Sequence, residues 1–177
     1  MTTYQGKEFE QELDERVIEI NRVATVVKGG RRFSFRVTMV VGDNKSSVGM
    51  GVGKANSVPD AMRKAAEKAK KNMKQIALSG STIPFEVVGK VSGAKVLLKP
   101  ASPGTGVIAA GSVRAVLEAV GISDILTKSL GSANMLNVVS ATMNALEQLK
   151  TPAQIAAERG ISLEKALPFW ESRKRNG

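Results

Sequence analysis

The stretch VGMGVGKANSV (residues 48–58) places glycine at every second position, at Gly49, Gly51 and Gly53. A period of two is that of a β-strand, in which alternate residues lie on one face. A face made of glycines carries no side chains, so another backbone or a helix can come close to it. The stretch therefore predicts a Gly-rich strand with a close neighbour. Ser57 and Pro59 then predict the start of a helix.

The same stretch resembles a phosphate-binding loop of a nucleotide enzyme, but its defining positions differ. A Walker loop has the pattern GxxxxGK(S/T), in which backbone amides wrap the phosphates and the hydroxyl binds Mg²⁺. Here Gly53 and Lys54 match, whereas Val48 replaces the first glycine and Ala55 replaces the hydroxyl. A dinucleotide pattern GxGxxG fails as well, because Lys54 stands where its third glycine belongs. A nucleotide-dependent enzyme is therefore a disfavoured alternative, and neither a cofactor nor a small-molecule substrate is expected.

The hydrophobic pattern predicts an α+β fold with two α/β-layer domains. Flexible acidic residues 1–14 precede a β-β-β-α module at 15–78, which resembles a double-stranded-RNA-binding domain without its first helix. A C-terminal β/α domain at 83–160, with helices packed on one face of its sheet, and a tail at 161–177 follow. The predicted strands are 15–27, 33–41, 47–53, 83–91, 94–100 and a short one within 122–131; the predicted helices are 58–78, 109–120, 134–149 and a short one from Thr151.

Charge is distributed unevenly along the 177 residues, which carry a net charge of +10. Residues 16–79 hold fourteen Lys or Arg and four Asp or Glu, whereas residues 1–15 hold one Lys and five acids. A basic segment this concentrated indicates a polyanionic partner, most often a nucleic acid, although a solvated basic surface is the simpler alternative. The chain has no Cys and no His, which excludes disulfides, thiolate zinc sites and histidine-based catalysis, and no metal site is predicted.

The turn KGGRR (residues 28–32) is the sharpest candidate for RNA contact. Its two glycines allow close backbone approach, and no carboxylate neutralises its three cations. The alternative is an ordinary solvated hairpin. Ser132 and Asn134 precede a predicted helix, where they either cap it or lie beside amides aimed at a phosphate. The candidate residues for RNA binding are Arg22, Lys28, Gly29, Gly30, Arg31, Arg32, Arg36, Lys54, Lys64, Lys68, Ser132 and Asn134.

Aromatic residues make up only 4% of the chain. Single-strand binders with RRM or OB folds use aromatic platforms, and no such pattern occurs. Few aromatics among many Lys and Arg favour recognition of folded RNA by its shape and backbone.

Several long segments together carry a family resemblance. In order along the chain they are NRVATVVKGGRRFSF, VVGDNKSSVGMGVGKANSVPDAMRKAAEKAKKNM, LKPASPGTGVIAAGSVRAVLEAVGISDILTKSLGS and NVVSATMNAL. They closely resemble the bacterial small-subunit ribosomal protein S5 family over roughly residues 15–160. One departure is Asn134-Met135, where family members often have Asn-Pro, so the start of the following helix is less firmly set.

The resemblance implies a structural, non-enzymatic constituent of the small ribosomal subunit in the cytoplasm, with no membrane association. It implies binding to small-subunit ribosomal RNA, contact with proteins S4 and S8, and support of decoding accuracy near the channel through which messenger RNA enters. It places Gly104, Gly106 and Arg114 at the boundary with S4. It also assigns the loop Val23–Arg32, including Val23, Ala24, Lys28 and Gly30, to spectinomycin resistance. A free-standing RNA-binding module outside the ribosome is the second alternative.

Overall fold

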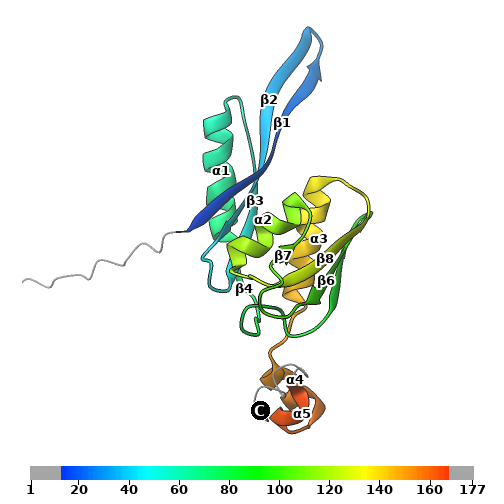
Figure 1. The fold of residues 1–177 in the computed structure, drawn as a ribbon. Helices are drawn as coiled ribbons and strands as arrows, with labels where there is room; N and C mark the ends of the chain where they lie inside the picture. The colour runs from blue at the N-terminus through cyan, green and yellow to red at the C-terminus, as the bar shows by residue number, and fades with distance from the viewer. Residues whose placement is uncertain (1–12, 168–177) are drawn as a thin grey trace, which may run out of the picture.

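The computed structural model describes residues 13–167 and contains two sheets, each accompanied by helices (Figure 1). The predicted α+β class with two sheet-containing domains is confirmed. Most of the acidic segment predicted at 1–14, and residues 168–177 of the predicted tail, lie outside the described residues. No helix within residues 13–167 is long and apolar enough to cross a membrane.

The first sheet has the order β1-β2-β3-β4 and is antiparallel throughout. Its strands are β1 (Asp14–Val27), β2 (Gly30–Gly42), β3 (Ser47–Ala55) and β4 (Lys74–Gln75). The helix α1 (Val58–Lys71) follows β3 and packs on one face of the sheet. Ser57 is its N-cap, as predicted, because its side chain accepts a hydrogen bond from the Asp60 amide.

The three alternating glycines of β3 lie directly under α1. A Cβ atom built on Gly51 would come within 2.0 Å of the carbonyl oxygen of Ala65, and one on Gly53 within 2.0 Å of that of Ala61. A Cβ atom on Gly49 would meet the oxygen of Ala69 at 2.1 Å. The predicted close approach is confirmed, and the neighbour is the backbone of α1. The glycines therefore set how closely helix and sheet pack.

The predicted helix 58–78 is wrong at its C-terminal end. The helix stops at Lys71, where the amide of the C-cap residue Asn72 donates to carbonyl oxygens of the last turn. The chain then turns into β4, which pairs with the start of β3. Met73 and Ile76 continued the helical spacing of apolar residues, but Ile76 packs into the core that the first sheet shares with the second domain. That long-range contact overrides the local pattern.

The second sheet has the order β5-β6-β8-β7. Its strands are β5 (Val87–Val91), β6 (Ala94–Pro100), β7 (Val107–Ile108) and β8 (Ile125–Gly131); β7 runs parallel to β8 and was not predicted. The helices α2 (Gly111–Val120) and α3 (Met135–Glu147) cover one face, as predicted. The short helices α4 (Pro152–Arg159) and α5 (Leu163–Ala166) follow, and Thr151 with Gln154 forms a capping box at the start of α4.

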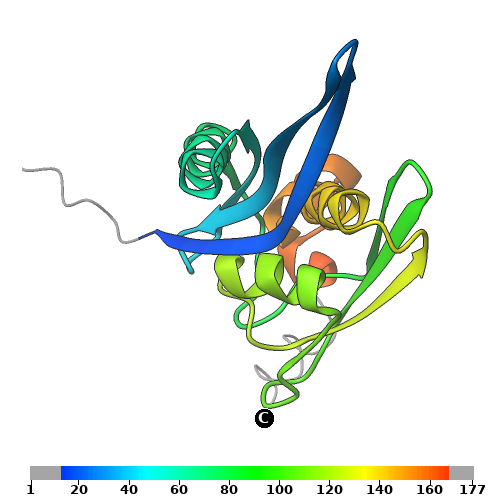
Figure 2. The same cartoon turned by 90° about the horizontal axis from the view of Figure 1, so that it is seen from above.

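The helix α2 also packs against the first sheet, so the two domains share one hydrophobic core (Figure 2). Val40 and Val48 of the first sheet belong to the same buried cluster as Leu117 of α2. A Cβ atom on Gly42 would lie 2.0 Å from the carbonyl oxygen of Ala119, and that oxygen accepts a hydrogen bond of 3.0 Å from the amide of Asn44. The first sheet is therefore held between α1 on one face and α2 on the other.

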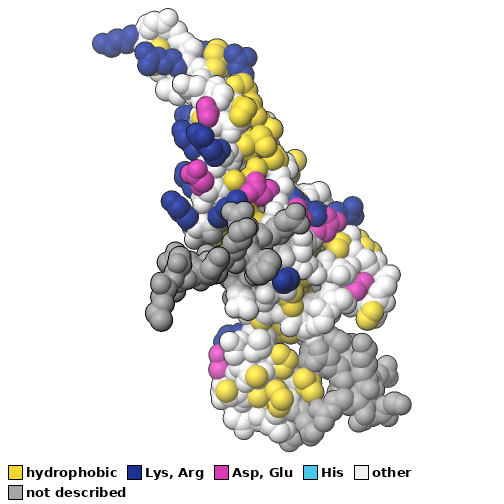
Figure 3. Space-filling model, turned by 90° about the vertical axis from the view of Figure 1, so that its left-hand side faces the viewer, with side chains coloured by type: hydrophobic (Ala, Val, Ile, Leu, Met, Phe, Trp, Pro, Cys, Tyr) yellow, Lys and Arg dark blue, Asp and Glu magenta, His cyan; other side chains and the backbone are white. Residues whose placement is uncertain are grey.

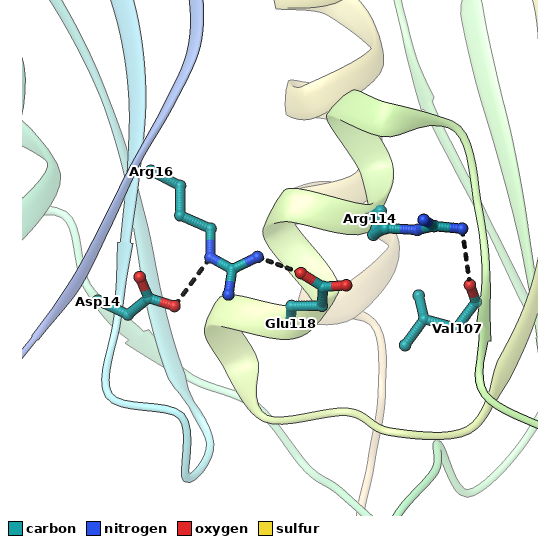
Figure 4. A network of polar contacts seen from close by, with 5 residues as sticks. All are labelled: Asp14, Arg16, Val107, Arg114 and Glu118. Carbon is teal, nitrogen blue, oxygen red and sulfur yellow. Dashed lines mark hydrogen bonds and ion pairs between the residues drawn. The ribbon is translucent and has the colours of Figure 1, made fainter. Parts of the chain in front are cut away.

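Polar side chains connect the two domains at the edge of their contact (Figure 4). The guanidinium of Arg16 on β1 donates to Glu118 on α2, and it also donates to Asp14 at 2.8 Å. Lys74 and Glu147 form a second ion pair between the domains, with Nζ and Oε1 2.8 Å apart. Both pairs are partly exposed and add less to the boundary than the apolar packing does.

Candidate nucleic-acid interface

The far end of the hairpin formed by β1 and β2 projects beyond the rest of the first sheet and beyond α1 (Figure 1). Its strands remain paired up to Val27 and Gly30, so Lys28 and Gly29 form the turn at the tip. Gly30 has φ of +143°, a conformation that side chains rarely adopt, which explains a glycine there. Lys28, Arg31 and Arg32 are all exposed. The structure thus gathers the predicted cations of the turn at the most distant point of the hairpin.

This end of the molecule carries no negative charge of its own. The sequence from Ile20 to Arg36 contains no Asp or Glu. Among the ion pairs between described residues, none involves Arg22, Lys28, Arg31, Arg32 or Arg36. Figure 3 shows Lys and Arg side chains gathered at the tip. The charge at the tip is therefore left for an outside anion.

Cations lie on both faces of the hairpin. Arg22 and Arg31 lie on the face that α1 covers lower down, because their cross-strand partners there are Phe35 and Val26. Arg32 and Arg36 point to the opposite face. Arg36 lies directly across from Lys54 of β3. Like charges directly opposite each other destabilise a sheet, so an anion near this pair would relieve the repulsion.

Lys54 lies just before α1, where a lysine can act with free amides of the first helical turn to bind a phosphate. In the structure Ser57 accepts from the Asp60 amide at 3.4 Å, Pro59 has no N–H, and the Asp60 carboxylate adds negative charge to this end of the helix. These groups make the start of α1 a poorer anion site than a free helix N-terminus.

The remaining candidate lysines lie on α1. Lys64 is exposed, and Lys68 donates from Nζ to the carbonyl oxygen of Val52 at 3.1 Å. That hydrogen bond holds the Lys68 side chain against the outer side of β3.

Asn134 caps α3, and Ser132 holds the turn just before it. The Asn134 side chain accepts from the amide of Asn137 at 3.4 Å, and the Ser132 hydroxyl accepts from the amide of Asn134 at 3.3 Å. The start of α3 is thus fixed by Asn134 although Met135 stands where a proline is frequent. This geometry supports the capping interpretation, which we had left open beside the phosphate-binding one.

A separate cluster of candidate residues lies in the loop before β7. Gly104 and Gly106 both have positive φ, and their amides donate to the same oxygen of Asp124 at 2.9 and 3.0 Å. The hydrogen bond from Gly106, together with that from Ser81, lowers the pKa of Asp124. Asp124 is buried and was not singled out in the sequence; only its place just before a strand gave any signal. Arg114 of α2 is exposed nearby and donates to the carbonyl oxygen of Val107 at 3.1 Å (Figure 4).

Val23 and Ala24, two residues of the predicted resistance loop, lie on β1 within the hairpin. Val23 is opposite Ser34 and half-buried, whereas Ala24 is exposed opposite Phe33. Together with Lys28 and Gly30 they form one continuous segment that leads to the tip.

One feature of the hairpin was missed in the sequence. Phe33 lies on the same face of β2 as Phe35, Val37 and Met39, in line with the alternation of apolar residues along this strand. However, α1 reaches only as far as Phe35, so Phe33 is 47% exposed. The guanidinium carbon of Arg22 lies 3.8 Å from the centre of its ring.

The turn between β2 and β3 is held by a carboxylate. One oxygen of Asp43 accepts from the amides of Lys45, Ser46 and Ser47 at 2.8 to 2.9 Å. Burial raises the pKa of Asp43, but these hydrogen bonds outweigh burial and lower it to about 2. Asp43 is thus a structural residue. Within residues 13–167 no group of three or more acidic side chains could hold a metal ion.

Two family models match the chain. The model described as ribosomal protein S5, N-terminal domain, matches residues 13–77, and that described as ribosomal protein S5, C-terminal domain, matches residues 89–159. Proteins of this family are structural, non-enzymatic constituents of the small ribosomal subunit in the cytoplasm, where they bind ribosomal RNA and neighbouring ribosomal proteins. Because the two matches together include both sheets and the basic hairpin, the chain belongs to the ribosomal protein S5 family.

Proposed function

We propose that the β1–β2 hairpin is the main contact of this protein with small-subunit ribosomal RNA. The observation that carries the proposal is the acid-free segment from Ile20 to Arg36 at the projecting end of a paired hairpin. Lys28, Arg31 and Arg32 at its tip bind phosphates, because Arg and Lys without carboxylate partners contact the RNA backbone. Gly29 and Gly30 allow the backbone of the turn to approach the RNA closely.

The lower half of the hairpin supports this role because it is fixed in the core. Val37 and Val41 of β2 pack under α1, and Val40 between them packs against the second domain. All three are fully buried. A projecting tip on such a base holds its cations in position, which lowers the entropy lost when RNA binds.

Further phosphate contacts come from the Arg36–Lys54 pair and from Lys64 on α1. Neither Arg36 nor Lys54 has a carboxylate partner among the described residues, and each faces the other's charge. A phosphate oxygen between them satisfies both. Arg22 is exposed on the other face. Lys68, Ser132 and Asn134 are weaker members of this proposed interface, because each already takes part in a local hydrogen bond.

The second part of the proposal concerns protein partners and decoding. Gly104 and Gly106 lie in a loop held by Asp124, and Arg114 is exposed beside it. This loop contacts protein S4, and changes there alter decoding accuracy. Protein S8 and the channel through which messenger RNA enters are the further neighbours that the family resemblance implies.

Substitutions at Val23, Ala24, Lys28 or Gly30 would change spectinomycin sensitivity, since these residues form one segment of the RNA-facing hairpin.

The test compares two triple variants of equal charge. The first is Lys28→Ala, Arg31→Ala, Arg32→Ala. The control is Lys74→Ala, Lys99→Ala, Lys150→Ala, whose cations are already paired with Glu147, Glu86 and Glu158. Each protein is titrated onto particles assembled from small-subunit ribosomal RNA and the other small-subunit proteins, at several salt concentrations.

Loss of three phosphate contacts should weaken binding and flatten the slope of log K against log salt by about two to three units, since each contact contributes about 0.7 to 0.9. The control should keep the slope of the unmodified protein. If both triple variants keep that slope, the hairpin tip does not contact phosphate.

A further inference from the structure

Phe33 lies on an RNA-facing hairpin without the cover that its strand neighbours have. It is 47% exposed, whereas Phe35 packs under α1. Its cross-strand partner is Ala24, whose methyl group is too small to shield the ring. Figure 3 shows hydrophobic side chains in a column below the basic tip. Ile20 and Val26 are exposed on the same face, so Phe33 belongs to an exposed apolar strip, and such strips mark interaction sites.

Arg22 packs on the ring of Phe33. Its guanidinium carbon lies 3.8 Å from the ring centre, which is stacking distance for a cation–π contact. No hydrogen bond or ion pair of the Arg22 guanidinium to a described residue accompanies this stack. The guanidinium thus lies over the ring, and both side chains are exposed on this face of the hairpin.

A simple shielding role for Arg22 does not account for the setting. Shielding an apolar ring can be done by any long side chain. Here the planar pair lies among cations, with no acid between Ile20 and Arg36. A nucleobase matches both properties, because it has a flat face for stacking and belongs to an anionic chain. An apolar protein partner would match only the ring.

We infer that Phe33 and Arg22 form a stacking platform for one unpaired base of the ribosomal RNA. The inference rests on the proposed RNA-binding role of the hairpin and gives that site a second mode of contact. Arg31 lies on the same face two residues before Phe33, about 7 Å along the strand, where it can bind a phosphate beside the stacked base. The hairpin therefore holds phosphates at its tip and a base on its flank.

The test uses variants that separate the aromatic ring from apolar bulk and from charge. Phe33→Leu keeps an apolar side chain and removes the ring, whereas Phe33→Tyr keeps the ring. Arg22→Lys keeps the charge and removes the planar guanidinium. The control, Val26→Ala, removes exposed apolar bulk from the same face. Thermal unfolding of each variant checks that the fold is intact.

Each variant is titrated onto particles lacking the protein, as above, and the assembled particles are irradiated at short wavelength to crosslink stacked rings to bases. Phe33→Leu and Arg22→Lys should bind about 5- to 150-fold more weakly, the loss that corresponds to one base stacked on an aromatic ring. Their salt slopes should stay unchanged, because no charge is lost. Phe33→Tyr and Val26→Ala should stay within about twofold of the unmodified protein. A peptide containing Phe33 should crosslink to one nucleotide, and Phe33→Leu should abolish this crosslink.

Two results would overturn the platform. The first is unchanged affinity and an unchanged crosslinking pattern in Phe33→Leu. The second is an equal loss in Phe33→Leu and Val26→Ala, which would indicate an apolar protein contact. Each of these results can be obtained while the triple variant of Lys28, Arg31 and Arg32 still lowers the salt slope. The stacking platform can therefore be refuted without refuting RNA binding by the hairpin tip.

Discussion

Gly51 offers a sharp test of how the first domain is built. In Gly51→Ala the new Cβ atom would lie 2.0 Å from the backbone oxygen of Ala65 and 2.5 Å from the amide of Ala69. The distance to the oxygen would have to rise to the 3.4 Å at which ordinary contact begins. Both obstacles are backbone atoms of α1, so no side chain can rotate away. Gly49 and Gly53 make the same close contact on either side, so the helix can withdraw only as a whole.

The cost follows from that geometry. Overpacking a close-packed core costs about 1–3 kcal/mol. We expect about 3 kcal/mol, because withdrawal of α1 loosens the buried contacts of Ala61, Ala65 and Ala69 with β2 and β3. The lower chain entropy of alanine in the unfolded state offsets only about 0.5–1 kcal/mol of this. The net loss of about 2–2.5 kcal/mol should lower the melting temperature of a chain of this size by roughly 4–10 °C.

The assay is urea and thermal unfolding followed by circular dichroism, with Gly29→Ala as the matched control. A Cβ atom on Gly29 meets nothing within 4 Å, and this residue has no positive φ. The control should therefore unfold within about 0.5 kcal/mol of the unmodified protein. If Gly51→Ala is as stable as Gly29→Ala, the glycines of β3 are not there to admit α1, and the explanation given for this strand is wrong.

Three further predictions concern single residues. The pKa of Asp43 is lowered from 3.8 to about 2, so its ionised form stabilises the fold by about 1 kcal/mol after solvent screening. This stabilisation is present above pH 4 and is lost as the pH falls toward 2. In Asp43→Asn the free energy of unfolding should therefore depend less on pH over that range. Gly106→Ala should destabilise the loop by about 1 kcal/mol, because its φ is +77°, and should change misreading in a reporter strain; normal misreading would contradict the proposed contact with S4. A double-mutant cycle on Arg16 and Glu118 should give a coupling of about 0.5–1 kcal/mol that decreases with salt; no coupling would mean that the pair adds nothing to the domain boundary.

Local patterns predicted much of the fold. The period-two alternation located β2 and β3, and Ser57 and Thr151 marked helix starts that the structure confirms. The extent of α1 was wrong because the spacing of Met73 and Ile76 imitates a helix, whereas Ile76 is buried against the second domain. The two-residue strand β7 exists through its pairing with β8 and has no signal in its own sequence.

The sequence predicted which cations belong to the candidate site, but it did not predict how their side chains are arranged. The run KGGRR gave the cations of the tip, since turn residues and charge are local properties. The pairing of Arg36 with Lys54 and the exposure of Phe33 depend on strand register and on where α1 ends, and neither can be read along the chain. The two hydrogen bonds from the Gly104 and Gly106 amides to Asp124 join residues about twenty positions apart. The sequence does not show this contact, because it depends on how the chain folds back on itself.

We propose that the projecting hairpin places this protein on small-subunit ribosomal RNA. The most direct measurement is crosslinking of the protein to RNA in small subunits recovered by gradient sedimentation, followed by mapping of the crosslinked residues. The protein should sediment with the small subunit, and crosslinks should fall mainly between Arg22 and Arg36. Crosslinks that avoid this segment, or a protein found wholly in the light fractions, would show that the hairpin is not the main RNA contact.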